Sequence, residues 1–119
     1  MKIEYASQKI ADQCTGLKAA KKLFGGDELM ARKLLARVQA LESALVLKDI
    51  IVQRQFRFHS LHGDREGYFA IDVKSRRDAW RIILQPLDES GEPFDPCHID
   101  EIAGMVRIVE VAEVSKHYE

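Results

Sequence analysis

The spacing of apolar residues changes near the middle of the chain, and this change constrains the fold most strongly. Before residue 48 the apolar side chains recur every three or four positions, whereas after residue 55 they alternate or form short runs rich in aromatic and β-branched residues. The first spacing is typical of amphipathic helices and the second of strands. Helices followed by strands predict an α+β fold rather than the repeating units of a parallel sheet.

The first half of the chain is predicted to hold a short strand, residues 3–5, and two helices. Ser7 is a suitable N-cap for a helix that runs to about Leu23, and Asp27 is a suitable cap for a second helix after Gly25-Gly26. A short break between two helices predicts an antiparallel helical hairpin. The stripes expected to be buried are Ile10, Cys14, Leu17 and Phe24 in the first helix, and Leu34, Val38, Leu41 and Leu45 in the second.

The second half is predicted to form an antiparallel sheet. A polar turn at residues 75–78 separates two aromatic and β-branched runs, which is the pattern of a β-hairpin. The expected strands cover residues 56–61, 68–73, 80–84 and 106–114, with a turn at 63–67, an acidic loop at 88–96 and one helical turn at 99–103.

Length and composition predict one domain over residues 1–119, with 46% hydrophobic residues available for its core. The N-terminus lacks the apolar run of a signal peptide, and nothing approaches the ~20 apolar residues of a membrane span. Cys14 and Cys97 have no metal-type spacing, and a buried thiol is expected for Cys14. We therefore expect a cytoplasmic protein without metal or cofactor, and without a membrane partner.

Charge is distributed unevenly along the chain. Residues 1–47 and residues 48–87 each carry eight Lys/Arg and five Asp/Glu, giving +3 per block, whereas residues 88–119 carry two and nine, giving −7. The three blocks sum to the net charge of −1. The basic part is suited to a polyanion and the acidic part to a basic partner, although ordinary solvated surfaces have the same composition.

Polar residues suited to chemistry gather in three places. The first is the turn that contains His62 and Arg65, and the second is the hairpin turn with Arg81 on the strand after it. The third is the end of the last predicted strand. No Ser/His/Asp nucleophile motif, phosphate-binding glycine loop or zinc spacing accompanies them. The hairpin turn contributes the cations Lys74, Arg76 and Arg77, and the chain end contributes Lys116, His117 and Tyr118.

The run LHGDREGY at residues 61–68, followed by WRI at residues 80–82, resembles the LKGDR…G…WRI signature of HigB-type toxins. The end of the chain occupies the place of that family's terminal DYH. The resemblance to the HigB/RelE group spans nearly the whole chain and is strongest over residues 58–85. It implies a RelE-like fold, in which an N-terminal strand and a two-helix hairpin pack on a small curved antiparallel sheet.

The resemblance also implies an activity, because members of this group are typically ribosome-dependent mRNA endonucleases that use no metal. An RNA 2′-hydroxyl must lose a proton to attack the adjacent phosphate, the 5′-oxygen must gain one, and cations must surround the phosphate. On this basis the candidates for proton transfer are His62, His117 and Tyr118. The candidates for phosphate stabilisation are Arg65, Arg81 and Lys116, and those for RNA backbone contact are Lys74, Arg76 and Arg77.

The sequence departs from the family pattern at two points: His62 replaces a lysine, and Lys116-His117-Tyr118 replaces Asp-Tyr-His. The set of chemical groups is retained, but the base and the acid are not assigned. The residues themselves leave alternatives open. His62 also fits an exposed turn, Arg65 a structural hydrogen bond or ion pair, the hairpin cations a solvated tip, and the terminal residues a frayed end.

The partner implied by the resemblance is a HigA-like helix-turn-helix antitoxin, with which the toxin reaches operator DNA only indirectly. The implied substrate is mRNA on the ribosome. Two alternatives remain open at this point. A ParE-like toxin on the same scaffold inhibits DNA gyrase by binding alone, and a decayed member serves only as an antitoxin-bound regulator.

Overall fold

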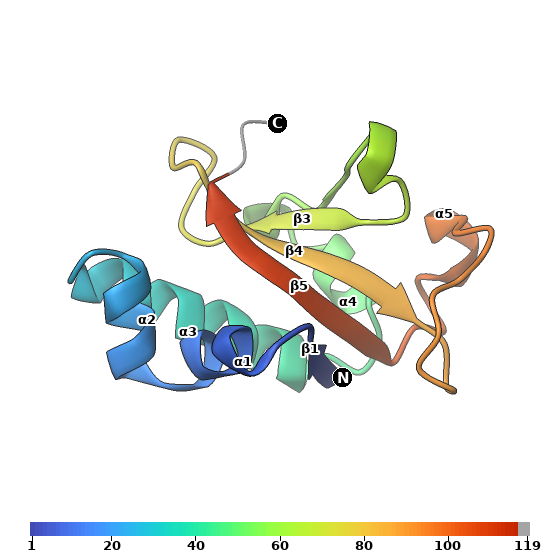
Figure 1. The fold of residues 1–119 in the computed structure, drawn as a ribbon. Helices are drawn as coiled ribbons and strands as arrows, with labels where there is room; N and C mark the ends of the chain where they lie inside the picture. The colour runs from blue at the N-terminus through green and yellow to red at the C-terminus, as the bar shows by residue number, and fades with distance from the viewer. Residues whose placement is uncertain (117–119) are drawn as a thin grey trace.

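The computed structural model describes residues 1–116, so the predicted site residues His117 and Tyr118 lie outside the described residues. The fold is α+β, as predicted, with helices along one side of a single twisted sheet (Figure 1). A terminal strand and most of the helices come first in the chain, and the sheet hairpin, one short helix and the last strand follow. Within the described range no helix has the length and apolarity needed to cross a membrane.

The sheet has five strands in the order β1-β5-β4-β3-β2. Their bounds are β1 Lys2–Tyr5, β2 His59–Ser60, β3 Phe69–Asp72, β4 Trp80–Leu87 and β5 Ile108–Lys116. The neighbouring pairs from β5 to β2 are antiparallel, whereas β1 pairs in parallel with β5. The N-terminal strand is therefore an edge of the sheet itself, and the sheet is mixed rather than purely antiparallel.

The helices are α1 Gln8–Thr15, α2 Leu17–Leu23, α3 Glu28–Ser43, α4 Lys48–Ile51 and α5 Ile99–Ile102, with 3₁₀ turns η1 Arg54–Phe56 and η2 Gly63–Arg65. Both predicted caps form, because Ser7 Oγ and Asp27 Oδ1 accept backbone N–H groups from Ile10 at 3.2 Å and Met30 at 3.1 Å. The single first helix that we predicted is wrong. Gly16 is extended (φ −129°, ψ 131°) and divides it into α1 and α2.

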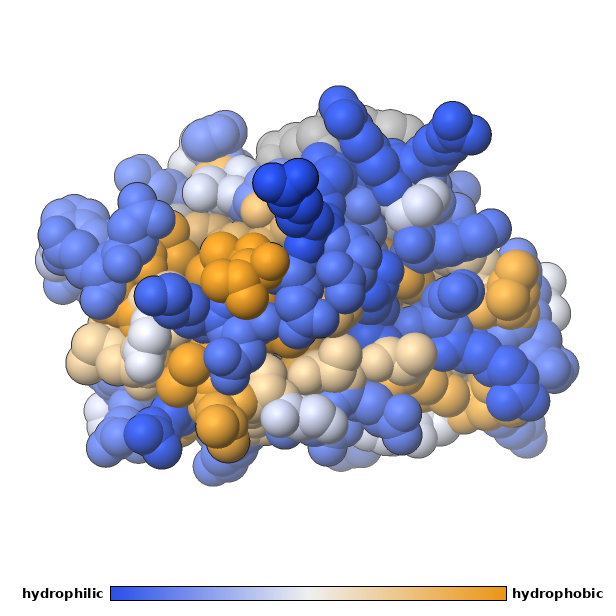
Figure 2. All heavy atoms as spheres, turned by 180° about the vertical axis from the view of Figure 1, so that it is seen from behind, coloured by the Kyte–Doolittle hydropathy of each residue, from blue (hydrophilic) through white to orange (hydrophobic). Residues whose placement is uncertain are grey.

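Leu45 is the second departure from the predicted pattern. The stripe of α3 buries Leu34, Val38 and Leu41, but the helix ends at Ser43 and Leu45 is 80% exposed. Asp49 explains the change of direction, since its Oδ2 accepts the backbone N–H groups of Leu45 at 3.0 Å and Val46 at 3.2 Å. From the opposite side, apolar side chains reach the surface in patches among hydrophilic ones (Figure 2).

The two faces of the sheet differ in what they bury. The face toward the helices carries the main core, in which strand residues pack with α3 and its neighbours. The other face, which we call the outer face, holds a smaller cluster of Leu61, Ala70 and Ile83, with Tyr68 and Ala112 packed against it. The strand residues of the main core are Ile71, Ile82, Leu84, Val109, Val111 and Val114, and Val73 directly after β3 joins them.

A β-bulge in β5 sets which residues reach each face. Leu84 pairs with Val111 and Ile83 pairs with Glu113, so Ala112 is an extra residue between them. Because side chains alternate along a strand, the extra residue reverses the alternation. Val111 and Val114 thus both face the helices, while Glu113 and Ser115 lie on the outer face opposite Ile83 and Arg81.

The contrast between Leu41 and Leu45 is directly testable. Leu41→Ala should lower the free energy of unfolding by about 2–5 kcal/mol, because Leu41 is fully buried and its truncation leaves a cavity. Leu45→Ala should change it by less than about 0.5 kcal/mol, as expected of an exposed side chain. Urea denaturation of both variants checks this, and a similar loss for both would contradict the end of α3 at Ser43.

The two free cysteines should differ in reactivity. Burial raises the pKa of the Cys14 thiol to about 12, and the side chain is only 2% exposed. Cys97 is half-buried, and burial raises its pKa as well. Alkylation of the native protein at pH 8 should therefore modify Cys97 and spare Cys14, since only the thiolate reacts. Peptide mass spectrometry identifies the modified residue, and rapid labelling of Cys14 would contradict its burial.

Candidate functional site

The outer face of the sheet brings together most of the polar residues of the central hairpin. Asp72 of β3 pairs with Arg81 of β4, which pairs in turn with Ser115 of β5. The next row on the same face lies two residues along each strand and consists of His59, Ala70, Ile83 and Glu113. Polar residues on a sheet face that no helix covers are the natural candidates for a binding or catalytic surface.

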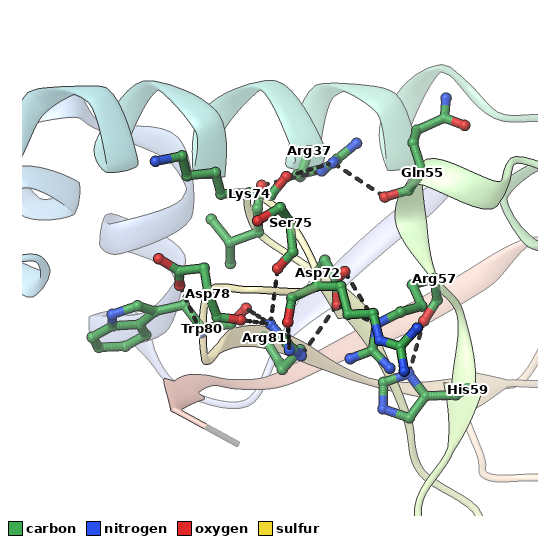
Figure 3. A network of polar contacts seen from close by, with 12 residues as sticks. Arg37, Gln55, Arg57, His59, Asp72, Lys74, Ser75, Asp78, Trp80 and Arg81 are labelled. Atoms are coloured by element: carbon green, nitrogen blue, oxygen red, sulfur yellow. Dashed lines mark hydrogen bonds and ion pairs between the residues drawn. The ribbon is translucent and has the colours of Figure 1, made fainter. Parts of the chain in front are cut away.

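Asp72 is the centre of this surface and is 1% exposed. Its carboxylate accepts two hydrogen bonds from Arg57 Nε, at 3.1 and 3.2 Å, and its Oδ1 lies 3.1 Å from Arg81 Nε (Figure 3). The Arg81 contact is an ion pair without hydrogen-bond geometry. One carboxylate thus faces two guanidinium groups, so this group of three, of which Asp72 and Arg81 are buried, carries a net positive charge.

Arg81 is 3% exposed and holds the hairpin turn from within. Its Nη1 donates to the carbonyl of Asp78, to that of Trp80 at 2.8 Å and to that of Ser75 at 3.5 Å. Its Nη2 donates to Arg76 O at 3.3 Å. Burial lowers the pKa of Arg81, and the charge of Asp72 opposes this. The turn that Arg81 holds exposes all three residues predicted to contact the RNA backbone, Lys74, Arg76 and Arg77.

A second arginine fastens the hairpin to the helices. Arg37 of α3 donates from Nε to Val73 O at 3.2 Å and from Nη2 to Gln55 O at 3.4 Å, and its guanidinium lies 4.7 Å from the centroid of the Phe56 ring. Figure 3 shows Arg37 reaching from its helix to the start of the turn. The basic turn is therefore held from both sides.

Arg65 lies at the edge of the outer face and is partly exposed. It forms an ion pair with Glu113 of β5, and both line a hollow of about 290 Å³ together with Asp64, Tyr68 and Ala112. The turn that carries Arg65 is closed by Arg65 N–H donating to His62 O at 3.3 Å. Since Glu113 fixes the guanidinium while leaving it solvent-accessible, Arg65 is placed to meet an anion that enters this hollow.

The remaining predicted residues are not gathered at one point. His62 is exposed and precedes η2, next to Arg65 in the turn but not among the residues that line its hollow. Lys116 lies on the helix side of the sheet, with its Nζ 5.8 Å from the centroid of the Trp80 ring. In residues 1–116 no group of three or more His, Cys, Asp or Glu is arranged to hold a metal ion.

Sequence reasoning missed Asp72, Arg57, Glu113 and Tyr68. Asp72 lies within a run of apolar residues, and a buried acid in such a run requires a cationic partner, which was the available signal. Glu113 reaches the outer face only because of the bulge. His59 was not among the predicted site residues. Its Nδ1 is 2.7 Å from Arg57 O, and its buried Nε2 has no hydrogen-bond partner in the described structure.

The comparisons with known proteins identify the class of fold. Neither a protein-family model nor a curated protein matches the sequence. Among solved structures the chain has the fold of small toxins of the RelE/YoeB type. The particular similar structures are the YoeB/ParE toxin from Agrobacterium tumefaciens (TM-score 0.56, 14% identity, 99% of this chain and 100% of that one) and YafQ from E. coli strain BL21(DE3) (0.49, 14%, 97% and 91%). The predicted fold is thereby confirmed, and the first of these similarities carries the assignment.

Removal of the Asp72 charge should destabilise the protein more than removal of the Glu113 charge, because only the first is buried. Asp72→Asn should lower the free energy of unfolding by about 3–5 kcal/mol, because two guanidinium groups lose their buried counter-charge. Glu113→Gln, the control, should cost less than about 1 kcal/mol, because the Arg65 pair is open to solvent. Chemical denaturation measures both, and equal losses would contradict the central place of Asp72.

Proposed function

We propose that this chain is the toxin of a type II toxin-antitoxin system, a HigB-like member of the RelE/ParE superfamily that cleaves mRNA on the ribosome. Two observations support the proposal: the fold shared with a protein named as a toxin, and the HigB-like sequence at residues 61–68 and 80–82. The observation that carries the activity is Arg65, a cation fixed at an open hollow on the outer face within that motif.

The proposed reaction is attack by an RNA 2′-hydroxyl on the adjacent phosphate. One base must take the hydroxyl proton as the new P–O bond forms, and one acid must protonate the departing 5′-oxygen. We assign the proton transfers to His62, His117 and Tyr118. Arg65 stabilises the charge that develops on the phosphate, and Lys116 adds positive charge near the end of β5. The requirement for a 2′-hydroxyl makes DNA inert.

Arg81 contributes to this proposal in a different way from Arg65. Its guanidinium is enclosed by Asp72 and by the carbonyls of the hairpin turn, so it acts as a positioning residue. We propose that it holds the turn so that Lys74, Arg76 and Arg77 contact RNA backbone phosphates. Such contacts supply affinity and orientation without reading the sequence.

The proposed partner is a HigA-like helix-turn-helix antitoxin in the cytoplasm, through which the toxin reaches operator DNA. The proposed reaction requires no metal or cofactor, since the groups named above supply base, acid and positive charge. Metal analysis of the purified protein tests this point. A stoichiometric zinc or manganese content would contradict it.

A second candidate function is inhibition of DNA gyrase by binding alone, because the similar structure is named as a YoeB/ParE toxin. The two functions leave different marks in a cell that expresses the chain without an antitoxin. Cleavage shortens mRNAs within translated codons and stops growth, whereas gyrase inhibition leaves mRNA intact and causes DNA damage and stalled replication.

If His62 and the terminal residues act in one site, two different changes should reduce mRNA cleavage to a similar extent. His62→Ala and removal of residues 117–119 should each reduce mRNA cleavage by about 10²–10⁴-fold, as expected when one proton-transfer group is lost. Combined, they should be scarcely worse than either alone, because groups that act as a unit are not additive. Primer extension on mRNA from expressing cells measures the cleavage, and circular dichroism checks that each variant folds.

His98→Ala is the control, because His98 is exposed, lies far along the chain in the acidic segment and has no role in the proposal. It should cleave as the unaltered chain does. If the truncated chain remains fully active while His62→Ala is inactive, the terminal residues are not part of the site.

A further inference from the structure

A hollow of about 340 Å³ lies on the helix side of the sheet, where the hairpin meets the turn between α2 and α3. It is separate from the hollow at Arg65, and the proposed reaction uses only one of its residues. Its principal lining residues are Phe24, Asp27, Met30, Asp78, Trp80 and Lys116. Trp80 and Asp78 lie at one end of the polar network, and Arg57 and His59 lie at the other (Figure 3).

The floor of the hollow is aromatic and rigid. The half-buried ring of Trp80 meets the ring of Phe24 edge to face, with centroids 4.8 Å apart and planes at 79°. Met30 is 5% exposed and packs in the main core beneath it. A fixed indole ring at the surface is a platform on which a flat ring can stack, and Lys116 Nζ lies 5.8 Å from its centroid.

The polar groups of the hollow are two carboxylates and one ammonium. Asp78 Oδ1 accepts the backbone N–H of Trp80 at 2.9 Å, and Asp27 Oδ1 accepts that of Met30 at 3.1 Å. Each therefore keeps a second oxygen as a hydrogen-bond acceptor. Neither carboxylate forms an ion pair with another described residue. Arg81 fixes Asp78 in place by donating to its backbone carbonyl.

We propose that this hollow binds a guanine base of the RNA strand, and this proposal rests on the proposed function. Guanine stacked on Trp80 would donate N1–H and N2–H₂ side by side to the carboxylate of Asp78. Lys116 would donate to the acceptors O6 and N7 of the same base. Single-stranded RNA is read through these base edges when a base is unstacked from its neighbours.

The chemistry of the other bases makes them poorer ligands. Adenine and cytosine each offer one exocyclic amino group beside a ring nitrogen that is an acceptor, which faces the carboxylate unfavourably. Uracil has its single N–H between two carbonyl oxygens. An apolar platform alone accepts every base, so the carboxylate supplies the discrimination. The hollow is therefore a specificity-determining site, which would give the bound RNA strand a preference for guanine at one position.

Trp80 makes the proposal testable without any cleavage assay, because it is the only tryptophan of the chain. The full-length protein is titrated with GMP, AMP, CMP and UMP, and with inorganic phosphate, while the tryptophan fluorescence is recorded. Saturable quenching is expected with GMP at a concentration at least about tenfold lower than with the other nucleotides. Equal quenching by all four nucleotides, an equal response to phosphate, or no saturable response would overturn the proposal.

Asp78→Asn is the decisive variant. The amide oxygen still accepts the backbone N–H of Trp80, while the second carboxylate oxygen becomes a donor that opposes N1–H and N2–H₂. GMP affinity should fall about tenfold or more to the level of the other nucleotides. Asp100→Asn, an exposed change in α5, is the matched control and should leave GMP binding unaltered. Unchanged GMP binding in Asp78→Asn would show that the carboxylate does not read the base.

The two proposals fail in different ways. If the chain cleaves no RNA, the proposed function fails, and the nucleotide titration still decides whether the hollow binds guanine. If the chain cleaves mRNA, the unaltered protein should cleave preferentially at codons that carry guanine at one particular position. Asp78→Asn should cleave without that preference. Cleavage with the same base preference in both proteins, together with a flat titration, overturns the guanine site alone.

Discussion

The Asp72 carboxylate, enclosed between Arg57 and Arg81, is the interaction on which the outer face depends. A buried charge is tolerated only where opposite charges and hydrogen bonds replace water, and Asp72 meets both conditions. Once Arg81 is held beside Asp72, its terminal nitrogens are directed at the carbonyls of the turn that begins at Ser75. The shape of the basic turn therefore follows from a carboxylate buried in the sheet rather than from the residues of the turn itself.

This arrangement divides the cations of the hairpin into two groups with different tasks. Arg81 and Arg37 both donate to backbone carbonyls; Arg81 is almost fully buried and Arg37 is half-buried. Burial lowers the pKa of both groups, which is the electrostatic mark of cations used for structure. Lys74, Arg76 and Arg77 remain exposed. Association costs less when the cations that meet a polyanion are already held in position. We therefore expect Arg81 and Arg37 to support the surface that we propose for RNA binding without touching the RNA.

The sequence predicted the class of fold, because the change from helical to strand spacing is local and needs no knowledge of contacts. Element ends were predicted less well. Gly16 redirects the chain through its extended backbone, and Asp49 does so by accepting two backbone N–H groups, neither of which apolar spacing records. For the candidate site, the resemblance selected both Arg65 and Arg81. It did not distinguish the buried Arg81 from the partly exposed Arg65, since that difference depends on Asp72 and Glu113, whose positions are fixed by strand register.

The bulge at Ala112 has a consequence for how the gene can change. Before Ala112 the odd-numbered residues of β5, Val109 and Val111, face the helices. After it the even-numbered Val114 does so, and valines therefore face the helices in both parts of the strand. Because Ala112 is the one residue of β5 without a partner in β4, loss of its codon would restore regular alternation and leave Glu113 and Ser115 on the outer face and Val114 toward the helices. The strand can therefore lose this residue without exchanging its two faces. We expect the length of the strand to vary by one residue at this position among relatives, while the valines on either side keep their phase.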